Sequence, residues 1–199
     1  MNVIEHYDNL INENNDPVHD PKPLQDYMNK WDGKEFIDEM QLDSNKSVLE
    51  IGVGTGRIAK KVAPFCKSFC GIDVSPKTIE KAKLNLYDNS NVDLICDDFM
   101  TYDFKQNFDI IYSSLTFMHI ENKQDAINKT AELLNKDGIF ALSIDKNQEK
   151  IIDMGTYKVD IYPDNPNEIE KYIKNANLSI KAKYETEFAY IFISQKQES

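Results

Sequence analysis

Glycine, arginine and cysteine are all scarce in this sequence. Only seven of its 199 residues are glycine, and Arg57 is its single arginine. The three cysteines contain no Cys-x-x-Cys pair, which is typical of a chain kept in a reducing compartment. No His/Cys cluster has the spacing of zinc ligands. We therefore expect a cytoplasmic protein without a metal site.

Long apolar runs and an excess of basic residues are absent as well. No segment approaches the roughly 20 apolar residues of a membrane-spanning helix, and the opening MNVIEHYDNL lacks the basic and apolar regions of a signal peptide. The formal net charge is −11, which opposes binding to a nucleic-acid backbone or an anionic membrane surface. We expect neither partner, and the oligomeric state stays open.

Short apolar segments alternate with helical patterns from residue 46 onward. Strands are expected at residues 47–51, 68–73, 92–96, 108–113 and 139–144. The helix that precedes the fifth strand is expected to stop near Gly138, since glycine commonly ends helices. Strands that alternate with helices predict an α/β fold, in which a parallel sheet is covered by helices on both faces.

The two ends of the chain depart from this alternation. Residues 178–187 and 188–194 form two expected strands with almost nothing between them, so they must pair as an antiparallel hairpin. Residues 1–45 are polar and broken by prolines, which predicts a helical N-terminal cap. The length suits one domain over residues 1–199, with the cap followed by a core at 46–195.

Three of the seven glycines alternate in LEIGVGTGR, residues 49–57, directly after the first expected strand. Ligands of open α/β sheets bind beyond the carboxyl ends of the strands, and glycine lets the backbone approach them closely. The alternative is a tight turn without a ligand. A dinucleotide-binding loop, G-x-G-x-x-G, has its third glycine where this chain has Arg57, which disfavours a nicotinamide-dependent reductase.

The run from Glu50 to Gly56 resembles motif I of the class I S-adenosylmethionine-dependent methyltransferases. Asp73 ends the second strand, where that family carries the acid that holds the ribose hydroxyls. The sequence Cys96-Asp97-Asp98-Phe99 follows the third strand, where the family carries an acid near the adenine amino group. The resemblance covers about residues 46–195 and includes the segments 108–114 and 133–140. It implies a Rossmann-like, seven-stranded, mostly parallel sheet with an antiparallel C-terminal hairpin.

The resemblance also implies the cofactor, S-adenosyl-L-methionine, and the residues that bind it. The candidates are Glu50, Gly52, Gly54, Gly56, Asp73, Val74, Asp97, Asp98, Phe99 and Ser113. Glu50 has a structural alternative, hydrogen bonding to N–H groups of the loop. Arg57 is either a surface residue or a support for the loop or for the methionine carboxylate of the cofactor.

The implied reaction is methyl transfer to a small-molecule acceptor. The methyl group of a sulfonium is already activated, so the protein mainly aligns the acceptor and excludes water. His119, after the fourth strand, is a candidate general base, and local packing is its alternative role. The acceptor is expected to meet residues 1–45 and 145–165, and the atom that is methylated is open.

Two other functions remain open on the sequence. One is a non-catalytic protein that binds S-adenosylmethionine. The other is a methyltransferase that acts on a protein or a nucleic acid. The nucleic-acid variant is disfavoured by the acidic charge and by Ser113-Ser114-Leu115-Thr116, which stands where amino-methylating nucleic-acid enzymes of this fold often carry an Asn-Pro-Pro-Tyr type element.

Overall fold

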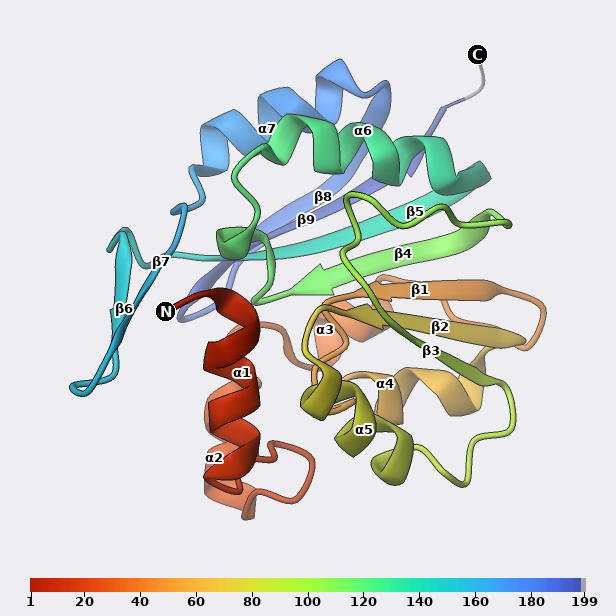
Figure 1. Ribbon diagram of the computed structural model, residues 1–199. Coiled ribbons are helices and arrows are strands. Elements are labelled where there is room, and N and C mark those ends of the chain that lie inside the picture. Colours follow the sequence, from red (N-terminus) through yellow and green to blue (C-terminus); the bar gives the residue numbers. More distant parts are fainter. Residues whose placement is uncertain (198–199) are drawn as a thin grey trace.

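Seven strands form one sheet, in the order β3-β2-β1-β4-β5-β9-β8 (Figure 1). The computed structural model describes residues 1–197. The strands are β1 (Ser47–Ile51), β2 (Ser68–Asp73), β3 (Val92–Cys96), β4 (Phe108–Ser114), β5 (Leu134–Asp145), β8 (Leu178–Glu185) and β9 (Ala189–Lys196). The first five are parallel, and β9 is antiparallel to both β5 and β8. The expected sheet and its C-terminal antiparallel pair are confirmed.

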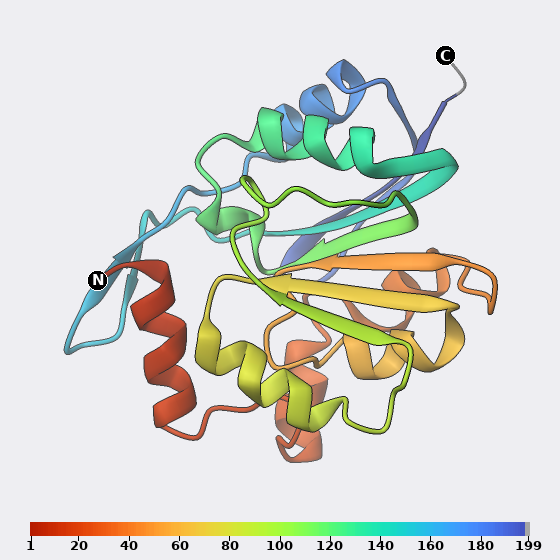
Figure 2. The ribbon, with the colours of Figure 1, turned by 45° about the vertical axis from the view of Figure 1, so that its right-hand side comes forward.

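Helices cover both faces of this sheet (Figure 2). One face packs against α3 (Gly33–Asp38), α4 (Ala59–Val62) with the short 3-10 turn η1 (Ala63–Phe65), and α5 (Pro76–Asn85). The other packs against α6 (Lys123–Leu133) and α7 (Pro166–Asn175). Successive strand residues point to opposite faces, so Val48 joins the first core cluster and Leu49 the second. The apolar strand segments therefore supply both halves of the core.

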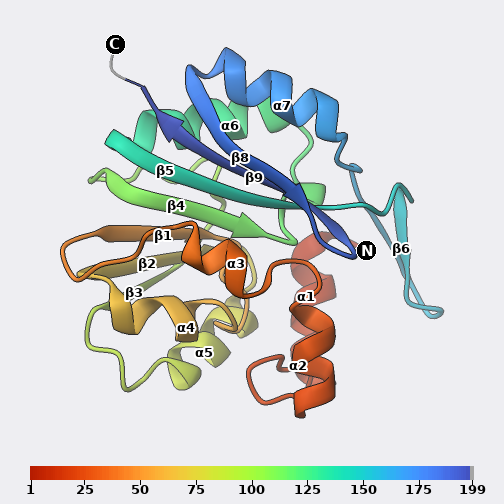
Figure 3. The same cartoon turned by 180° about the vertical axis from the view of Figure 1, so that it is seen from behind.

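The N-terminal segment forms α1 (Val3–Asn12) and α2 (Lys22–Met28), which lie beside the carboxyl ends of the parallel strands (Figure 3). Asn2 and Glu5 make a capping box that starts α1. The carboxylate of Asp8 accepts hydrogen bonds from Ser75 Oγ at 2.7 Å and from the backbone N–H of Lys77 at 3.3 Å. These bonds fix α1 to the first turn of α5.

A small hairpin not expected from the sequence follows β5. Its strands are β6 (Ile151–Asp153) and β7 (Lys158–Asp160), joined by a turn in which Gly155 has a φ of +80°. Three-residue strands are too short to show a clear alternation in sequence. The hairpin meets the start of α1, where the Met1 amino group donates to the Lys158 carbonyl oxygen at 3.1 Å.

The end of α6 differs from the expectation. The helix ends at Leu133, and the next residue already belongs to β5. Asp137, at a φ of +60°, lies where the pairing of β4 with β5 shifts its register. A Cβ on Gly138 would lie 2.9 Å from the Asn135 carbonyl oxygen and 3.1 Å from that of Asp109. Gly138 thus permits a close approach within an irregular strand and does not cap the helix.

Candidate active site

A cavity of about 940 Å³ lies beyond the carboxyl ends of the parallel strands. The sheet order reverses at β1 and β4, and such a switch point is where open α/β sheets bind ligands. The glycine loop, the ends of β2 and β3 and the segment after β4 form the inner wall. Helices α1 and α2 form the outer wall.

All three glycines of the loop have positive φ, at +76°, +56° and +94° for Gly52, Gly54 and Gly56. A Cβ on Gly54 would meet no atom within 4 Å, and this residue lines the cavity. A Cβ on Gly52 would lie 2.0 Å from Thr116 Oγ1. One on Gly56 would lie 3.1 Å from the Leu86 side chain, outside the cavity lining. Gly54 therefore exposes backbone to the cavity, whereas Gly56 serves packing against the end of α5.

Asp73, at the end of β2, connects the loop to α5. Its Oδ2 accepts the backbone N–H of Gly54 at 3.0 Å, and its Oδ1 accepts that of Ser75 at 3.0 Å. Burial raises the pKa of Asp73, and these N–H bonds act in the opposite direction. Each carboxylate oxygen can accept a further hydrogen bond, so Asp73 is able to bind ligand hydroxyls from the cavity wall.

The acids after β3 line the same cavity. The backbone N–H of Asp97 donates to the Asp73 carbonyl oxygen at 3.0 Å, which brings the two strand ends together. The Asp98 carboxylate accepts the backbone N–H of Met100 at 2.8 Å. Val74 and the buried Phe99 add apolar surface. Asp73, Val74, Asp97, Asp98 and Phe99 thus form one continuous wall.

Glu50 lies at the base of the cavity with only 3% of its surface exposed. Its Oε2 accepts a hydrogen bond from the Tyr112 hydroxyl at 2.8 Å. Burial raises the pKa of Glu50 well above its ordinary value, although Tyr112 and the positive charge of Arg57 oppose that rise. The hydrogen bond from Tyr112 ties β1 to the neighbouring β4 beneath the glycine loop.

Arg57 ends the glycine loop and is partly buried, with 13% of its side chain exposed. Its guanidinium forms a bidentate pair with Asp32, in which Nη1 lies 3.1 Å from Oδ1. Ser114 Oγ also donates to Asp32, at 2.9 Å. Asp32 precedes α3, so the pair joins the N-terminal segment to the loop. The sequence did not indicate Asp32, because 25 residues separate it from Arg57.

His119 belongs to η2 (Phe117–His119), a 3-10 turn after β4. Its Nε2 lies 2.9 Å from the Tyr7 hydroxyl on α1, and both residues line the cavity. Its Nδ1 is buried and finds no hydrogen-bond partner within residues 1–197. Burial lowers the pKa of His119 to about 4 and raises that of Tyr7, so both side chains are neutral near pH 7. The sequence offered no signal for Tyr7 beyond its being an aromatic residue of the cap.

Ser113 is fully buried, and its hydroxyl donates to the Ile51 carbonyl oxygen at 2.9 Å. The next residue, Ser114, lines the cavity instead. Nine of the candidates meet at the cavity: Glu50, Gly52, Gly54, Asp73, Val74, Asp97, Asp98, Phe99 and His119. Gly56 and Ser113 lie behind its wall.

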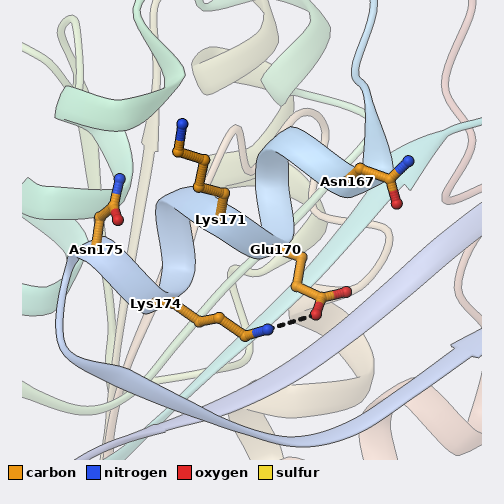
Figure 4. Close-up of a pocket in the computed structure, with 5 residues that line it drawn as sticks. All are labelled: Asn167, Glu170, Lys171, Lys174 and Asn175. Atoms are coloured by element: carbon orange, nitrogen blue, oxygen red, sulfur yellow. Dashed lines mark hydrogen bonds and ion pairs between the residues drawn. The ribbon is translucent and has the colours of Figure 1, made fainter.

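A second hollow, of about 390 Å³, lies on the outer side of α7. Figure 4 shows that its lining side chains all come from this one helix: Asn167, Glu170, Lys171, Lys174 and Asn175. Lys174 and Glu170 form an ion pair there at 2.6 Å. Because the lining residues all belong to one helix, this hollow is a shallow depression of the surface and not a candidate site.

The switch-point cavity, with glycines of positive φ facing an acidic residue at the end of the second strand, defines a Rossmann-like ligand-binding protein. Residues 49–142 match a family model described as a methyltransferase domain. The solved N-methyltransferase NodS from Bradyrhizobium japonicum, in complex with S-adenosyl-L-homocysteine, has the same fold, with a TM-score of 0.70 and 17% identity over 92% of this chain and 95% of that one. The resemblance to the class I S-adenosylmethionine-dependent methyltransferases that the sequence predicted is therefore confirmed, with the methyltransferase domain matched over residues 49–142.

Two curated relatives are malonyl-[acyl-carrier protein] O-methyltransferases. The one from Ilyobacter polytropus is 33% identical over 99 residues, which cover 49% of this chain and 37% of the relative. The one from Acetivibrio thermocellus is 30% identical over 113 residues, covering 54% and 39%. The matched part therefore spans less than two fifths of these relatives. Methyltransferases of this family use S-adenosylmethionine, the cofactor that the sequence resemblance implies.

No helix within residues 1–197 has both the length and the apolar character needed to cross a membrane. The same residues contain no group of three or more His, Cys, Asp and Glu side chains placed to hold a metal ion.

Proposed function

We propose that this chain binds S-adenosylmethionine in the switch-point cavity and transfers its methyl group to a small-molecule acceptor. The observation that carries this proposal is the meeting of Gly54, Asp73 and the acids after β3 in one cavity. The cavity is near the upper end of ligand-site volumes, roughly 300–1,000 Å³. A cofactor and a small acceptor can both fit in such a volume.

The residues present suit this cofactor. The open space beside Gly54 leaves room for the ligand against the loop backbone. Asp73 is placed to accept the two ribose hydroxyls, and Asp97 or Asp98 the adenine amino group. Val74 and Phe99 offer apolar surface to the adenine ring. The acidic lining also favours a cofactor that carries a cationic sulfonium.

The bound cofactor supplies an activated methyl group, so the work of this chain is alignment and exclusion of water. Helices α1 and α2 cover the cavity and narrow its access from solvent. The segment after β4, held by the contact of Gly52 with Thr116, is placed to set the position of the acceptor. Tyr7 and His119 offer neutral hydrogen-bonding groups beside it.

Two features favour a small acceptor over a protein or nucleic acid: the cavity is covered by α1 and α2, and the net charge is −11. Part of the apolar lining comes from α1 and α2, which would have to move to admit a macromolecule. A non-catalytic protein that binds the cofactor shares the same cavity. Formation of S-adenosylhomocysteine in the presence of an acceptor distinguishes that alternative.

Calorimetric titration with S-adenosylmethionine, S-adenosylhomocysteine and NADH tests the proposal. We expect micromolar affinity for both adenosyl ligands and none for NADH. Asp73→Ala removes the carboxylate at the centre of the wall and should abolish adenosyl binding. Asp93→Ala, an exposed acid on β3, is the matched control and should bind normally. A well-folded native protein that binds neither adenosyl ligand would overturn the proposal.

A further inference from the structure

The mouth of the cavity, where α1 and α2 line it, is mostly apolar, with Asn2, Asn15 and Asp20 as polar residues among the lining. Ile4, Leu24 and Tyr27 line the cavity from α1 and α2, yet 43%, 49% and 46% of their surfaces are exposed. Leu115 and Met118 continue this surface on the side of the segment after β4. Large apolar side chains left exposed around a cavity mark a ligand-binding surface. This end of the cavity therefore suits an apolar acceptor.

The cavity also holds no cation that is available for an anionic acceptor. Within the described chain, no lysine lines it, and Arg57 is the one arginine there. Both terminal nitrogens of Arg57 are bonded to Asp32. The neutral His119 adds no charge. An acceptor that carries a negative charge loses its hydration in this part of the cavity without gaining an opposite charge, which is unfavourable.

The histidine at the same place is a weak base. His119 is hydrogen bonded to Tyr7, and burial lowers its pKa to about 4. A phenolic hydroxyl with a pKa near 10 holds its proton roughly a million-fold more tightly than this imidazole. His119 is therefore too weak a base to deprotonate a nucleophile such as a phenol before it attacks. An uncharged amine already presents a lone pair and needs no base before it attacks.

We propose that the acceptor is an apolar molecule bound uncharged, that its reacting atom is a neutral amine nitrogen beside Tyr7 and His119, and that the acceptor end of the cavity disfavours carboxylates. This rests on the proposed function. The amine lone pair forms the new N–C bond while the C–S bond breaks, and that electron pair stays on sulfur. The methylated nitrogen carries the positive charge that leaves the sulfonium. It then releases one proton to water.

The charge balance agrees with the lining. The positive charge moves from sulfur to nitrogen and is never lost from the cavity during the step. Acidic side chains line the cavity, among them Asp20 and Asp98, and the cavity holds one cationic centre before and after the step. An acceptor carboxylate would instead be placed among these acids.

Three naphthalenes of one shape provide the test: 2-aminonaphthalene, 2-naphthol and 2-naphthoate. Their binding to protein saturated with S-adenosylhomocysteine is measured by fluorescence titration. We expect the amine to bind at least about tenfold more tightly than the carboxylate. With S-adenosylmethionine, mass spectrometry should show the methylated amine and no methylated naphthol. Preferred binding of the carboxylate, preferred methylation of the naphthol, or no binding of any of the three would each overturn the inference.

A charge placed at the mouth tests the same inference without turnover. Leu24→Arg adds a cation beside the acceptor and should raise the affinity for 2-naphthoate while lowering that for the amine. Leu84→Arg, on α5 at a side chain that is 73% exposed and outside the cavity, is the matched control and should change neither. Equal effects of the two variants would contradict the assignment of the mouth to the acceptor. Failure of the native protein to bind S-adenosylhomocysteine would instead overturn the proposed function itself.

Discussion

Substituting two glycines that have similar backbone conformations distinguishes an effect on ligand binding from an effect of backbone strain on stability. Gly54 and Gly155 have φ of +56° and +80°, and a Cβ on either would meet no atom within 4 Å. Alanine at each should therefore cost a similar stability, roughly 1–2 kcal/mol. Gly54 lines the cavity and Gly155 lies in the β6–β7 turn, so only Gly54→Ala should weaken S-adenosylhomocysteine binding, by about tenfold or more.

Thermal melts and calorimetry of the two variants measure both quantities. Equal ligand affinities for Gly54→Ala and Gly155→Ala would show that the loop backbone does not approach the ligand.

Gly52 is constrained in a different way, by contact with another segment. A Cβ there would lie 2.0 Å from Thr116 Oγ1 and 2.8 Å from Thr116 Cβ. Gly52→Ala must displace the segment after β4, and overpacking of this kind costs roughly 1–3 kcal/mol beyond the backbone strain. In Thr116→Ala the hydroxyl and methyl are removed, so the double variant should lose less stability than the sum of the single ones.

Urea denaturation of the four proteins of this cycle measures the coupling. If the stability losses of the two single variants simply add in the double variant, Gly52 and Thr116 are not coupled by this contact.

Helix α1 covers the cavity, so the strength of its attachment to the rest of the protein should control how fast a ligand enters and leaves. Asp8 fixes the helix to Ser75 and Lys77 at the start of α5. At the other side, His6 Nδ1 lies 3.2 Å from the Tyr157 hydroxyl of the β6–β7 hairpin. The helix α1 is short, and one of its sides faces the cavity instead of packing on the protein. Loss of the Asp8 hydrogen bonds should therefore increase the population of conformations in which α1 is locally detached.

We therefore expect Asp8→Ala to speed amide hydrogen exchange across residues 3–12 and to increase the dissociation rate of S-adenosylhomocysteine several-fold. The control is Asp26→Ala, an exposed residue of α2 whose carboxylate pairs with Lys22 on the same helix. Stopped-flow displacement of the ligand gives the rates. Unchanged exchange and dissociation in Asp8→Ala would show that α1 is held by its apolar contacts instead.

Elements with a strong local pattern could be predicted from the sequence, and elements defined by distant contacts could not. The parallel strands are short apolar segments, and the final pair had too few connecting residues for any arrangement but antiparallel. The prediction that the helix stops near Gly138 was wrong, because a glycine that ends a helix cannot be distinguished in sequence from one that lets two backbone segments approach closely. The β6–β7 hairpin has strands of three residues and left no periodic signal.

The same division holds in the candidate site. Asp73, at the end of β2, and Asp97, just after β3, were predicted from the resemblance to the methyltransferase motifs, and the parallel topology brings these strand ends together. Asp32 was missed because its partner Arg57 lies 25 residues away, and the pairing of Tyr7 with His119 was not predicted because 112 residues separate them. Sequence spacing carries no information about such pairs. The strand ends that line the cavity and the presence of the N-terminal cap beside them were therefore predictable, whereas the side-chain pairs that join the cap to the core were not.

At the scale of the whole molecule, buried carboxyl groups and buried histidines have opposite effects on how the free energy of unfolding changes as the pH falls. Burial raises the pKa of Glu50, Asp73 and Asp164. A carboxyl group whose pKa is raised by folding binds its proton more readily in the folded state, so it favours folding as the pH falls. His6 and His119, whose pKa values are lowered by burial, act in the other direction. The pH dependence of the native protein alone cannot separate these contributions, but a single substitution can.

His119→Gln isolates one of them. Above pH 6.5 the imidazole is neutral in the folded and unfolded chains, so it adds no pH dependence. Between its ordinary pKa of 6.5 and its folded pKa of about 4, only the unfolded chain takes up the proton. The native protein should therefore lose stability relative to His119→Gln as the pH falls through this window, by roughly 3 kcal/mol at its lower end. His19→Gln, at a side chain that is 66% exposed, is the control and should follow the native protein. Urea denaturation of the three proteins from pH 7 to pH 4 measures the difference, and parallel curves for the native protein and His119→Gln would show that His119 takes up its proton equally in both states.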